Sequence, residues 1–387
     1  MDLRHSPDVL AFRAEARAWL TAHTPARPLP SLETREGFAA HRAWEAELAA
    51  DRWSVVSWPK EYGGRGADLE HWLVFEEEYH AAGAPGRVSQ NGISLLAPTL
   101  LAHGTTEQRA RILPPMASGA QVWAQAWSEP EAGSDLASLR ARADRTTGGW
   151  LLSGRKTWSS RAAFADRAFG LFRCDPEAGR PHQGLISVMF GLTAPGVTVH
   201  PIGRLDGKPA FAELCLDEVF VPDRDVIGAP GDGWRIAMDA TADERGLTLR
   251  SPGRYLAAAA RLTALWRASG RTGDTALRDR VADAVIGARA YQLFVWAAAS
   301  RALADPGRRA PSAPSPLSSL TKVHWSELDL ALHETALDLL AEDGEFADTP
   351  WAEGHLFALA GPIYAGTNEI QRDIIAERLL GLPKGRR

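Results

Sequence analysis

Cysteine is scarce in this chain of 387 residues, which contains only Cys174 and Cys215. Two cysteines exclude a disulfide framework and a cysteine-based zinc site. Long apolar runs are missing as well, because no segment approaches the roughly 18 apolar residues that a membrane-spanning helix needs. The N-terminal segment MDLRHSPDVLAFRAEARAWL carries charges throughout and does not resemble a secretory signal. We therefore expect no membrane segment and a cytoplasmic location.

An excess of basic residues is also absent. The 43 Lys and Arg residues are outnumbered by 48 Asp and Glu residues, which gives a formal net charge of −5. Nucleic acids and anionic membranes are bound by concentrated basic surfaces, so this balance argues against both as main partners. A hydrophobic content of 45% is ordinary for a globular protein with a large core, and the length predicts two or three domains.

The spacing of apolar residues changes twice along the chain. Near the start, Val9, Phe12 and Ala16 recur at helical intervals. Later segments such as LISVMFG and FAELCLDEVFV are short, rich in β-branched and aromatic residues, and bounded by turn residues. Helical spacing then returns in Ala- and Leu-rich stretches. We predict a helical domain over residues 1–121, a β domain of six or seven strands over 122–230 and a helical domain over 231–387.

Four helices are expected in the last domain, at 254–268, 276–304, 318–341 and 368–380, with the Pro- and Ser-rich segment 305–316 as an inter-helix loop. A helical, then β, then helical order disfavours Rossmann folds and β/α barrels, in which strands and helices alternate. The expected class is α+β.

Five short motifs occur along the chain. WPKEYGGRG (58–66) precedes the β domain, AWSEPEAGSDLASL (126–139) and GRKTWSS (154–160) lie within it, and DERG (243–246) and YAGTNEIQRDIIAERLLGLP (364–383) follow it. In order and spacing these motifs resemble the acyl-CoA dehydrogenase family over nearly the whole chain. The similarity is greatest to the actinobacterial branch that includes steroid side-chain and biosynthetic acyl dehydrogenases.

The resemblance implies both a fold and an activity. The fold would be an N-terminal helical domain, a central β-barrel and a C-terminal four-helix bundle. FAD would lie between barrel and bundle, with its adenosine end against a neighbouring subunit of a homodimer, a homotetramer or a heteromer. The enzyme would desaturate an acyl group between its α and β carbons. The acyl group would be carried as a thioester of CoA or acyl carrier protein, and electron-transferring flavoprotein would accept the electrons.

The small residues of AWSEPEAGSD suit a backbone that approaches a cofactor closely. By resemblance, Ala126, Trp127 and Ser128 line the pyrimidine side of the flavin. Ser134 would meet the FAD pyrophosphate or the pantetheine arm of the substrate. An ordinary hairpin turn is the alternative for this segment, and Glu131 replaces the glycine that is usual in the family.

Two further motifs would complete the flavin site. In KTWSS, the resemblance places Trp158 against the flavin and Ser160, in place of the usual threonine, beside flavin N5. Charge develops at that nitrogen during the reaction, so a hydrogen-bond donor there is stabilising. Thr367 and Glu369 would hold the FAD pyrophosphate and ribose at the start of the last helix. Outside the motif context, Trp158 also fits a core position and Thr367 a helix cap.

The general base departs from the common pattern. In most of the family a glutamate immediately before the Gly-Thr pair removes the α proton, but this chain has Ala365 there. A minority of the family carries the base in a Glu-Arg pair on a bundle helix, which corresponds here to Glu244 and Arg245. We expect Glu244 to be the base, Arg245 to contact the thioester carrier and the backbone N–H of Ala365 to donate to the thioester carbonyl. An exposed, ion-paired helix face is the alternative for Glu244 and Arg245.

Two other functions fit the same motifs. A flavin oxidase or monooxygenase on this fold would need no α-proton base. A non-catalytic subunit would take flavin contacts or its base from a partner polypeptide. Asp338 and the turn at 341–344 replace amide and glycine residues that contact the FAD adenosine in the family, so the adenosine contacts are not assigned.

Overall fold

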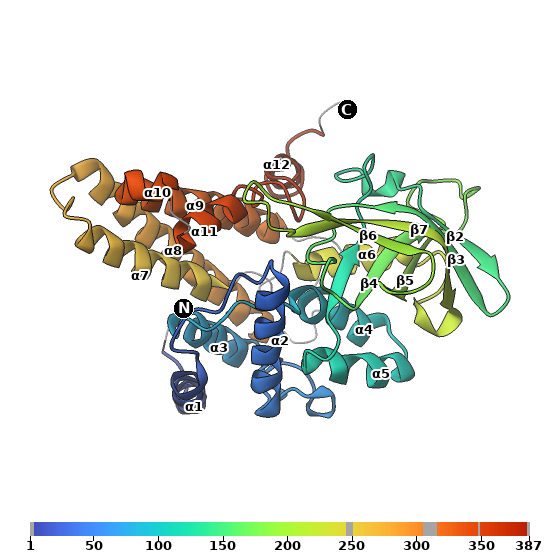
Figure 1. Cartoon of the computed structure of the whole chain (residues 1–387), viewed down its shortest axis with the longest axis horizontal. Helices are drawn as coiled ribbons and strands as arrows, with labels where there is room; N and C mark the ends of the chain where they lie inside the picture. Colours follow the sequence, from blue (N-terminus) through green and yellow to red (C-terminus); the bar gives the residue numbers. More distant parts are fainter. Residues whose placement is uncertain (1–3, 245–250, 305–315, 347–348, 385–387) are drawn as a thin grey trace. The chain divides into compact units, whose positions relative to one another are not determined.

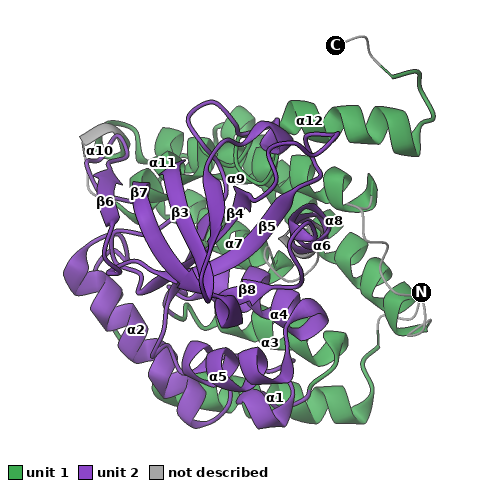
Figure 2. Cartoon of the chain, turned by 90° about the vertical axis from the view of Figure 1, so that its right-hand side faces the viewer, with its two compact units in different colours: residues 1–26, 67–84, 245–387 green, residues 27–66, 85–244 purple. Residues whose placement is uncertain are grey.

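The computed structural model describes residues 4–244, 251–304, 316–346 and 349–384 (Figure 1). The chain forms two compact units, each built from segments distant in the sequence (Figure 2). Unit 1 comprises residues 1–26, 67–84 and 245–387, and unit 2 comprises the remainder. The described part of unit 1 is helical, whereas unit 2 combines a sheet with helices.

The helices of unit 1 begin at residues suited to helix starts. α1 (Pro7–His23) is capped by the Ser6 hydroxyl, and α3 (Leu69–Ala81) is capped by the Asp68 carboxylate. α3 packs against α7 (Pro252–Ala268). The other helical elements of this unit are α8 (Thr275–Ala304), α9 (Pro316–Leu340), α10 (Glu342–Phe346), α11 (Pro350–Ala358), α12 (Asn368–Ile374) and a π turn, Ile375–Leu379.

The helices of unit 2 are tied to its sheet by side-chain hydrogen bonds. α5 (Thr106–Ala117) starts with a capping box in which Thr105 and Gln108 exchange hydrogen bonds. The Gln108 amide also donates to the carbonyl oxygen of Val226, at 2.6 Å. The other helical elements are α2 (Arg35–Ala50), α4 (Ala97–His103), α6 (Gly233–Glu244), a π turn (Gly92–Leu96) and the 3-10 turns Lys60–Tyr62, Leu136–Ser138 and Asp223–Asp225.

The strands of unit 2 form one sheet in the order β6-β7-β3-β2-β4-β5-β8, and β1 pairs with β4 in parallel. β3 and β7 pair in antiparallel fashion, from Gly149 opposite Pro222 to Lys156 opposite Leu214. The strands are β1 (Trp123–Ala126), β2 (Arg142–Thr146), β3 (Gly149–Lys156), β4 (Arg167–Arg173), β5 (Leu185–Gly191), β6 (Val197–Ile202), β7 (Phe211–Pro222) and β8 (Val226–Ile227).

The alternation of side chains along β3 determines which of them enter the core. Trp150 and Leu152 lie two residues apart and are buried in an apolar cluster with residues of β7 such as Leu214 and Val219. Lys156 continues the same period and is also fully buried. A charged side chain therefore ends the row of core residues on this strand.

The predicted order of helical, β and helical segments and the α+β class are confirmed. The four predicted C-terminal helices correspond to α7, α8, α9 and α12 with its π turn. Eight strands are found in the described residues because the mostly polar β2 and the two-residue β8 form as well. The predicted loop at 305–316 lies, apart from its last residue, outside the described residues, and the bounds of the three domains stay a prediction. Within the described ranges, no helix combines the length and apolarity needed to cross a membrane.

Candidate active site

Two of the predicted flavin segments lie side by side in unit 2. β1 ends at Ala126, and Trp127 and Ser128 follow it directly. The backbone N–H of Thr157, just beyond the end of β3, donates to the carbonyl oxygen of Ser128 at 2.9 Å. The structure thus brings the segment that begins at Ala126 next to the segment that carries Trp158.

A buried ion pair fixes these two segments to each other. Lys156 Nζ lies 2.8 Å from a carboxylate oxygen of Glu129 and also donates to the carbonyl oxygen of Trp127, at 3.2 Å. The Glu129 carboxylate accepts the backbone N–H groups of Arg140 and Ala141, at 2.7 and 2.9 Å. Burial lowers the pKa of Lys156 to about 8, against the attraction of Glu129.

Lys156 and Glu129 lie inside the motifs GRKTWSS and AWSEPEAGSDLASL but were not predicted as site residues. The available signal was the period of β3, since Lys156 stands four residues after Leu152 on the face that also carries Trp150. A lysine on the buried face of a strand requires an anionic partner. The identity of that partner depends on the fold, because Glu129 lies 27 residues away in the sequence.

Trp158 occupies an unusual backbone conformation on the protein surface. Its φ angle is +59°, in the left-handed region that bulky L-residues avoid, and its side chain is 60% exposed. The next residue, Ser159, exchanges two backbone hydrogen bonds with Ala212, each 3.0 Å long, which hold the segment in place. The indole ring packs edge-on against Phe211. A flat aromatic face is therefore presented to solvent by a strained backbone, a combination found at functional sites.

Polar groups in the two segments that begin at Ala126 and at Gly154 have hydrogen-bonding capacity that the described residues do not use. Trp127 Nε1 and the Ser159 hydroxyl are buried without a hydrogen-bond partner among the described residues. Within the same ranges, no hydrogen bond is made by the hydroxyls of Ser128, Ser134 and Ser160. Ser134 is exposed in the loop that follows, and Ser160 is half-buried. Unused donors on two segments joined by the Thr157–Ser128 hydrogen bond fit the binding of a planar, hydrogen-bonding ring such as flavin.

The C-terminal motif that begins at Tyr364 lies in unit 1. Thr367 caps α12 by accepting the backbone N–H of Ile370, at 3.3 Å. The pKa of Glu369 is lowered by hydrogen bonds from its own backbone N–H and from the Thr367 hydroxyl. Before the cap, Ala365 and Gly366 are both left-handed, with φ angles of +56° and +81°. The chain turns sharply here, so the Ala365 N–H belongs to an unusual backbone conformation.

The predicted base and its neighbour fall where side chains are not described. Glu244 is the last residue of α6, and its side chain lies outside the described residues. Arg245 lies in the segment 245–250, which is also outside them. The structure therefore tests neither prediction.

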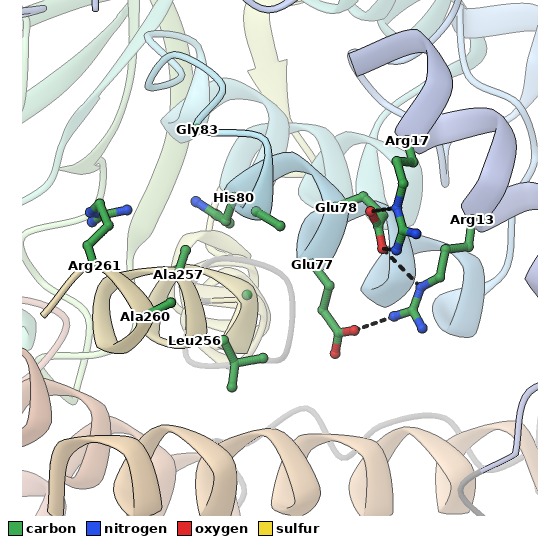
Figure 3. A pocket seen from close by; sticks show the side chains of 12 residues that line it. Arg13, Arg17, Glu77, Glu78, His80, Gly83, Leu256, Ala257, Ala260 and Arg261 are labelled. Atoms are coloured by element: carbon green, nitrogen blue, oxygen red, sulfur yellow. Dashed lines mark hydrogen bonds and ion pairs between the residues drawn. The ribbon is translucent and has the colours of Figure 1, made fainter. Parts of the chain in front are cut away.

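A pocket of about 510 Å³ lies elsewhere in unit 1, among α1, α3 and α7 (Figure 3). Two arginines on α1 pair with two carboxylates on α3 along one side of it: Arg17 donates twice to Glu78, at 2.9 and 2.8 Å, and Arg13 pairs with Glu77. Its lining includes no residue of the predicted site.

Three family models match the chain, in sequence order. Their descriptions are acyl-CoA dehydrogenase, N-terminal domain (residues 6–120), middle domain (residues 124–219) and C-terminal domain (residues 231–380). Together they span almost all of the chain.

Individual proteins give the same result. The chain is similar to the acyl-CoA dehydrogenase IpdE1 of Mycobacterium tuberculosis, with 37% identity over 392 residues that cover 97% of this chain and 98% of the relative. Among solved structures it is similar to the Tcur3481-Tcur3483 steroid ACAD, with a TM-score of 0.84, 27% identity and 100% of both chains covered. It is also similar to the ChsE4-ChsE5 complex from Mycobacterium tuberculosis, with a TM-score of 0.81, 28% identity and 100% of both chains covered.

Proposed function

The chain belongs to the acyl-CoA dehydrogenase family and is an oxidoreductase acting on CH–CH groups, and from this membership we propose its cofactor, substrate class and catalytic residues. The proposed enzyme binds FAD and desaturates an acyl thioester between its α and β carbons. The observation that carries the cofactor assignment is the exposed, backbone-strained Trp158 beside the segment that begins at Ala126.

The proposed FAD contacts come from the motifs that begin at Ala126, Gly154 and Tyr364. Trp158 would pack against the flavin, and Ser160 would donate a hydrogen bond near flavin N5. Ala126, Trp127 and Ser128 would line the pyrimidine side. Ser134 would contact the FAD pyrophosphate or the pantetheine arm of the substrate. Thr367 and Glu369 would contact the FAD pyrophosphate and ribose. FAD, when bound, supplies the acceptor for the hydride that leaves the β carbon.

Glu244 is the proposed base, Arg245 the proposed contact of the thioester carrier, and Ala365 the proposed carbonyl-binding residue. The α proton of a thioester is only weakly acidic, so removing it requires a carboxylate and a hydrogen bond to the carbonyl oxygen, where negative charge accumulates. Ala365 has no proton chemistry in its side chain, and its backbone N–H is the proposed donor of that bond. In the products, the α proton is on Glu244 and a double bond joins the α and β carbons.

The substrate and partners are proposed from two observations. The relatives with solved structures include a steroid ACAD and a ChsE4-ChsE5 complex, so a steroid-derived acyl-CoA is the first thioester to test and a heteromer is a real alternative to a homodimer or homotetramer.

Large apolar side chains near the C-terminus are exposed: Ile363 by 66%, Leu380 by 64% and Leu382 by 53%. Such residues are commonly covered by another polypeptide. Electron-transferring flavoprotein is the proposed electron acceptor.

The proposal is tested with the purified, full-length protein. Its visible spectrum and the cofactor released on denaturation should identify FAD. Anaerobic addition of acyl thioesters, both CoA and acyl carrier protein forms, should bleach that spectrum for the correct acyl class. Release of hydrogen peroxide without a requirement for a base would favour a flavin oxidase. A colourless protein that gains flavin only with a second polypeptide would favour a non-catalytic subunit.

A further inference from the structure

Gln371 is fully buried on α12 and reaches back to the turn that precedes the helix. Its side-chain amide nitrogen donates to the carbonyl oxygens of Ala365 and Gly366, each at 3.3 Å. Both contacts are acceptors, so the amide can only be oriented with its nitrogen toward the turn. Its Oε1 is buried without a hydrogen-bond partner among the described residues. The hydrogen bonds that this side chain makes within those residues therefore all go to the turn.

The helix from which Gln371 projects is anchored independently. Asn368 Oδ1 accepts from Lys322 Nζ at 2.7 Å and from the Ser326 hydroxyl at 3.1 Å, and all three side chains are buried. The backbone N–H of Asn368 also donates to the carbonyl oxygen of Pro362, at 2.8 Å. α12 is thus tied to α9 and to the chain before the turn, so it forms a fixed support for the Gln371 side chain.

The turn itself needs support. Two successive left-handed residues are unfavourable, and Ala365 lacks the freedom that glycine has in this region. If the turn relaxed toward an ordinary conformation, the peptide planes around Ala365 would rotate and its N–H would change direction. A hydrogen bond to a carbonyl oxygen weakens steeply with such misalignment.

We propose that Gln371 is a positioning residue: by clamping the carbonyl groups of Ala365 and Gly366, it aims the Ala365 N–H at the carbonyl oxygen of the acyl thioester. This inference rests on the proposed function. It predicts that loss of the clamp weakens recognition of the carbonyl group in particular, with little effect on the rest of the ligand.

The test compares two unreactive ligands on the FAD-loaded protein. The first is a 2,2-dimethylacyl-CoA, which has no α hydrogen and so cannot be oxidised. The second is the matching S-alkyl-CoA thioether, in which a methylene group replaces the carbonyl. The wild-type protein should bind the thioester more tightly, by roughly tenfold, because only the thioester accepts the hydrogen bond. In Gln371→Met that ratio should fall to about twofold or less, with a thioether Kd close to wild type. Gln371→Glu keeps the shape but places a carboxylate against two carbonyl groups, and should lose the ratio as well.

Gln292→Met is the matched control, since Gln292 is another buried glutamine of unit 1, bound to Glu77 on α3. It should retain the wild-type ratio. Equal weakening of both ligands in the Gln371 variants would indicate a merely structural role and overturn the inference, as would an unchanged ratio. A wild-type protein that does not distinguish the two ligands would also overturn it. Failure of the proposed function looks different, because no acyl thioester would then bind or bleach the wild-type flavin.

Discussion

Lys156 Nζ lies 2.8 Å from Glu129 Oε1, and the two side chains are only 0% and 8% exposed. Lys156 stands two residues before Trp158, and Glu129 directly follows Ser128, so this contact joins the two proposed flavin segments of unit 2. The Glu129 carboxylate is further held by the backbone N–H groups of the two residues just before β2. The pair therefore fixes the backbone geometry on which the proposed flavin contacts depend.

Replacing Lys156 with methionine should destabilise the protein and release flavin. Breaking a buried ion pair leaves an uncompensated charge and costs about 3–5 kcal/mol of unfolding free energy. Arg145→Met is the control, because Arg145 and Asp223 form an ion pair in the same unit that is about half exposed. Because that pair is exposed to solvent, its loss should lower the unfolding free energy far less. Denaturant unfolding and the FAD content after gel filtration measure both effects, and equal losses in the two variants would contradict the assignment.

The same lysine predicts a pH dependence of stability. Burial lowers the pKa of Lys156 to about 8, whereas the pKa of a lysine in the unfolded chain is about 10.4. Between these values the unfolded state binds more protons than the native state, so the contribution of this site to stability rises as the pH increases. The unfolding free energy of the wild type minus that of Lys156→Met should increase from about pH 8 to about pH 10.4. A difference that stays constant or falls over this pH range would show that the pKa of Lys156 is not lowered in the native state.

Trp158 should be more important for cofactor binding than for folding. Glycine at this position relieves the left-handed strain, so the flavin-free Trp158→Gly protein should unfold within about 1 kcal/mol of wild type. Its affinity for FAD should nevertheless fall at least about tenfold, because the aromatic wall is lost. Arg52→Gly is matched to it, since Arg52 is exposed and has a φ angle of +61°. The Arg52→Gly variant should also unfold within about 1 kcal/mol of wild type, and its affinity for FAD should be unchanged. Wild-type FAD affinity in Trp158→Gly would contradict a role of Trp158 in cofactor binding.

The exposed apolar residues near the C-terminus should lie in a subunit interface. Leu380→Asp and Ile363→Asp place a charge on this surface and should shift sedimentation toward smaller species at micromolar concentration. Leu205→Asp serves as the comparison, because Leu205 is 85% exposed in unit 2 and should have no such effect. Unchanged assembly in the two C-terminal variants would mean that another surface forms the interface.

The sequence predicted the elements of the fold better than it predicted their contacts. The segments around α7, α8 and α9 carry long Ala- and Leu-rich helical spacing, which local pattern alone reveals. β2 lacks such a signal because Ala143 is its only buried residue, and it forms by pairing with β3. Pairing of this kind depends on the partner strand and is not encoded within five residues.

In the candidate site, too, the sequence revealed the motif residues but not the contacts between them. Ala126 and Trp158 were found because they lie within motifs. The supports Lys156 and Gln371 are also within motifs, but their roles depend on contacts that bring the chain back on itself. Asn368 and Gln371 are spaced three apart on one helical face, and that pair of amides was the signal available for the clamp. The burial of a charge or an amide becomes evident only when the residues packed around it are known.

The identity of the base tests the account most directly, through the rate at which an acyl thioester reduces the bound flavin in a single anaerobic turnover. Glu244→Gln keeps the shape of the side chain and removes the proton acceptor, so this rate should fall at least about 100-fold while FAD content and thioester affinity stay near wild type. Ala365→Glu, added to Glu244→Gln, should restore part of the rate if both positions reach the same α carbon. Flavin reduction at the wild-type rate in Glu244→Gln would contradict the account.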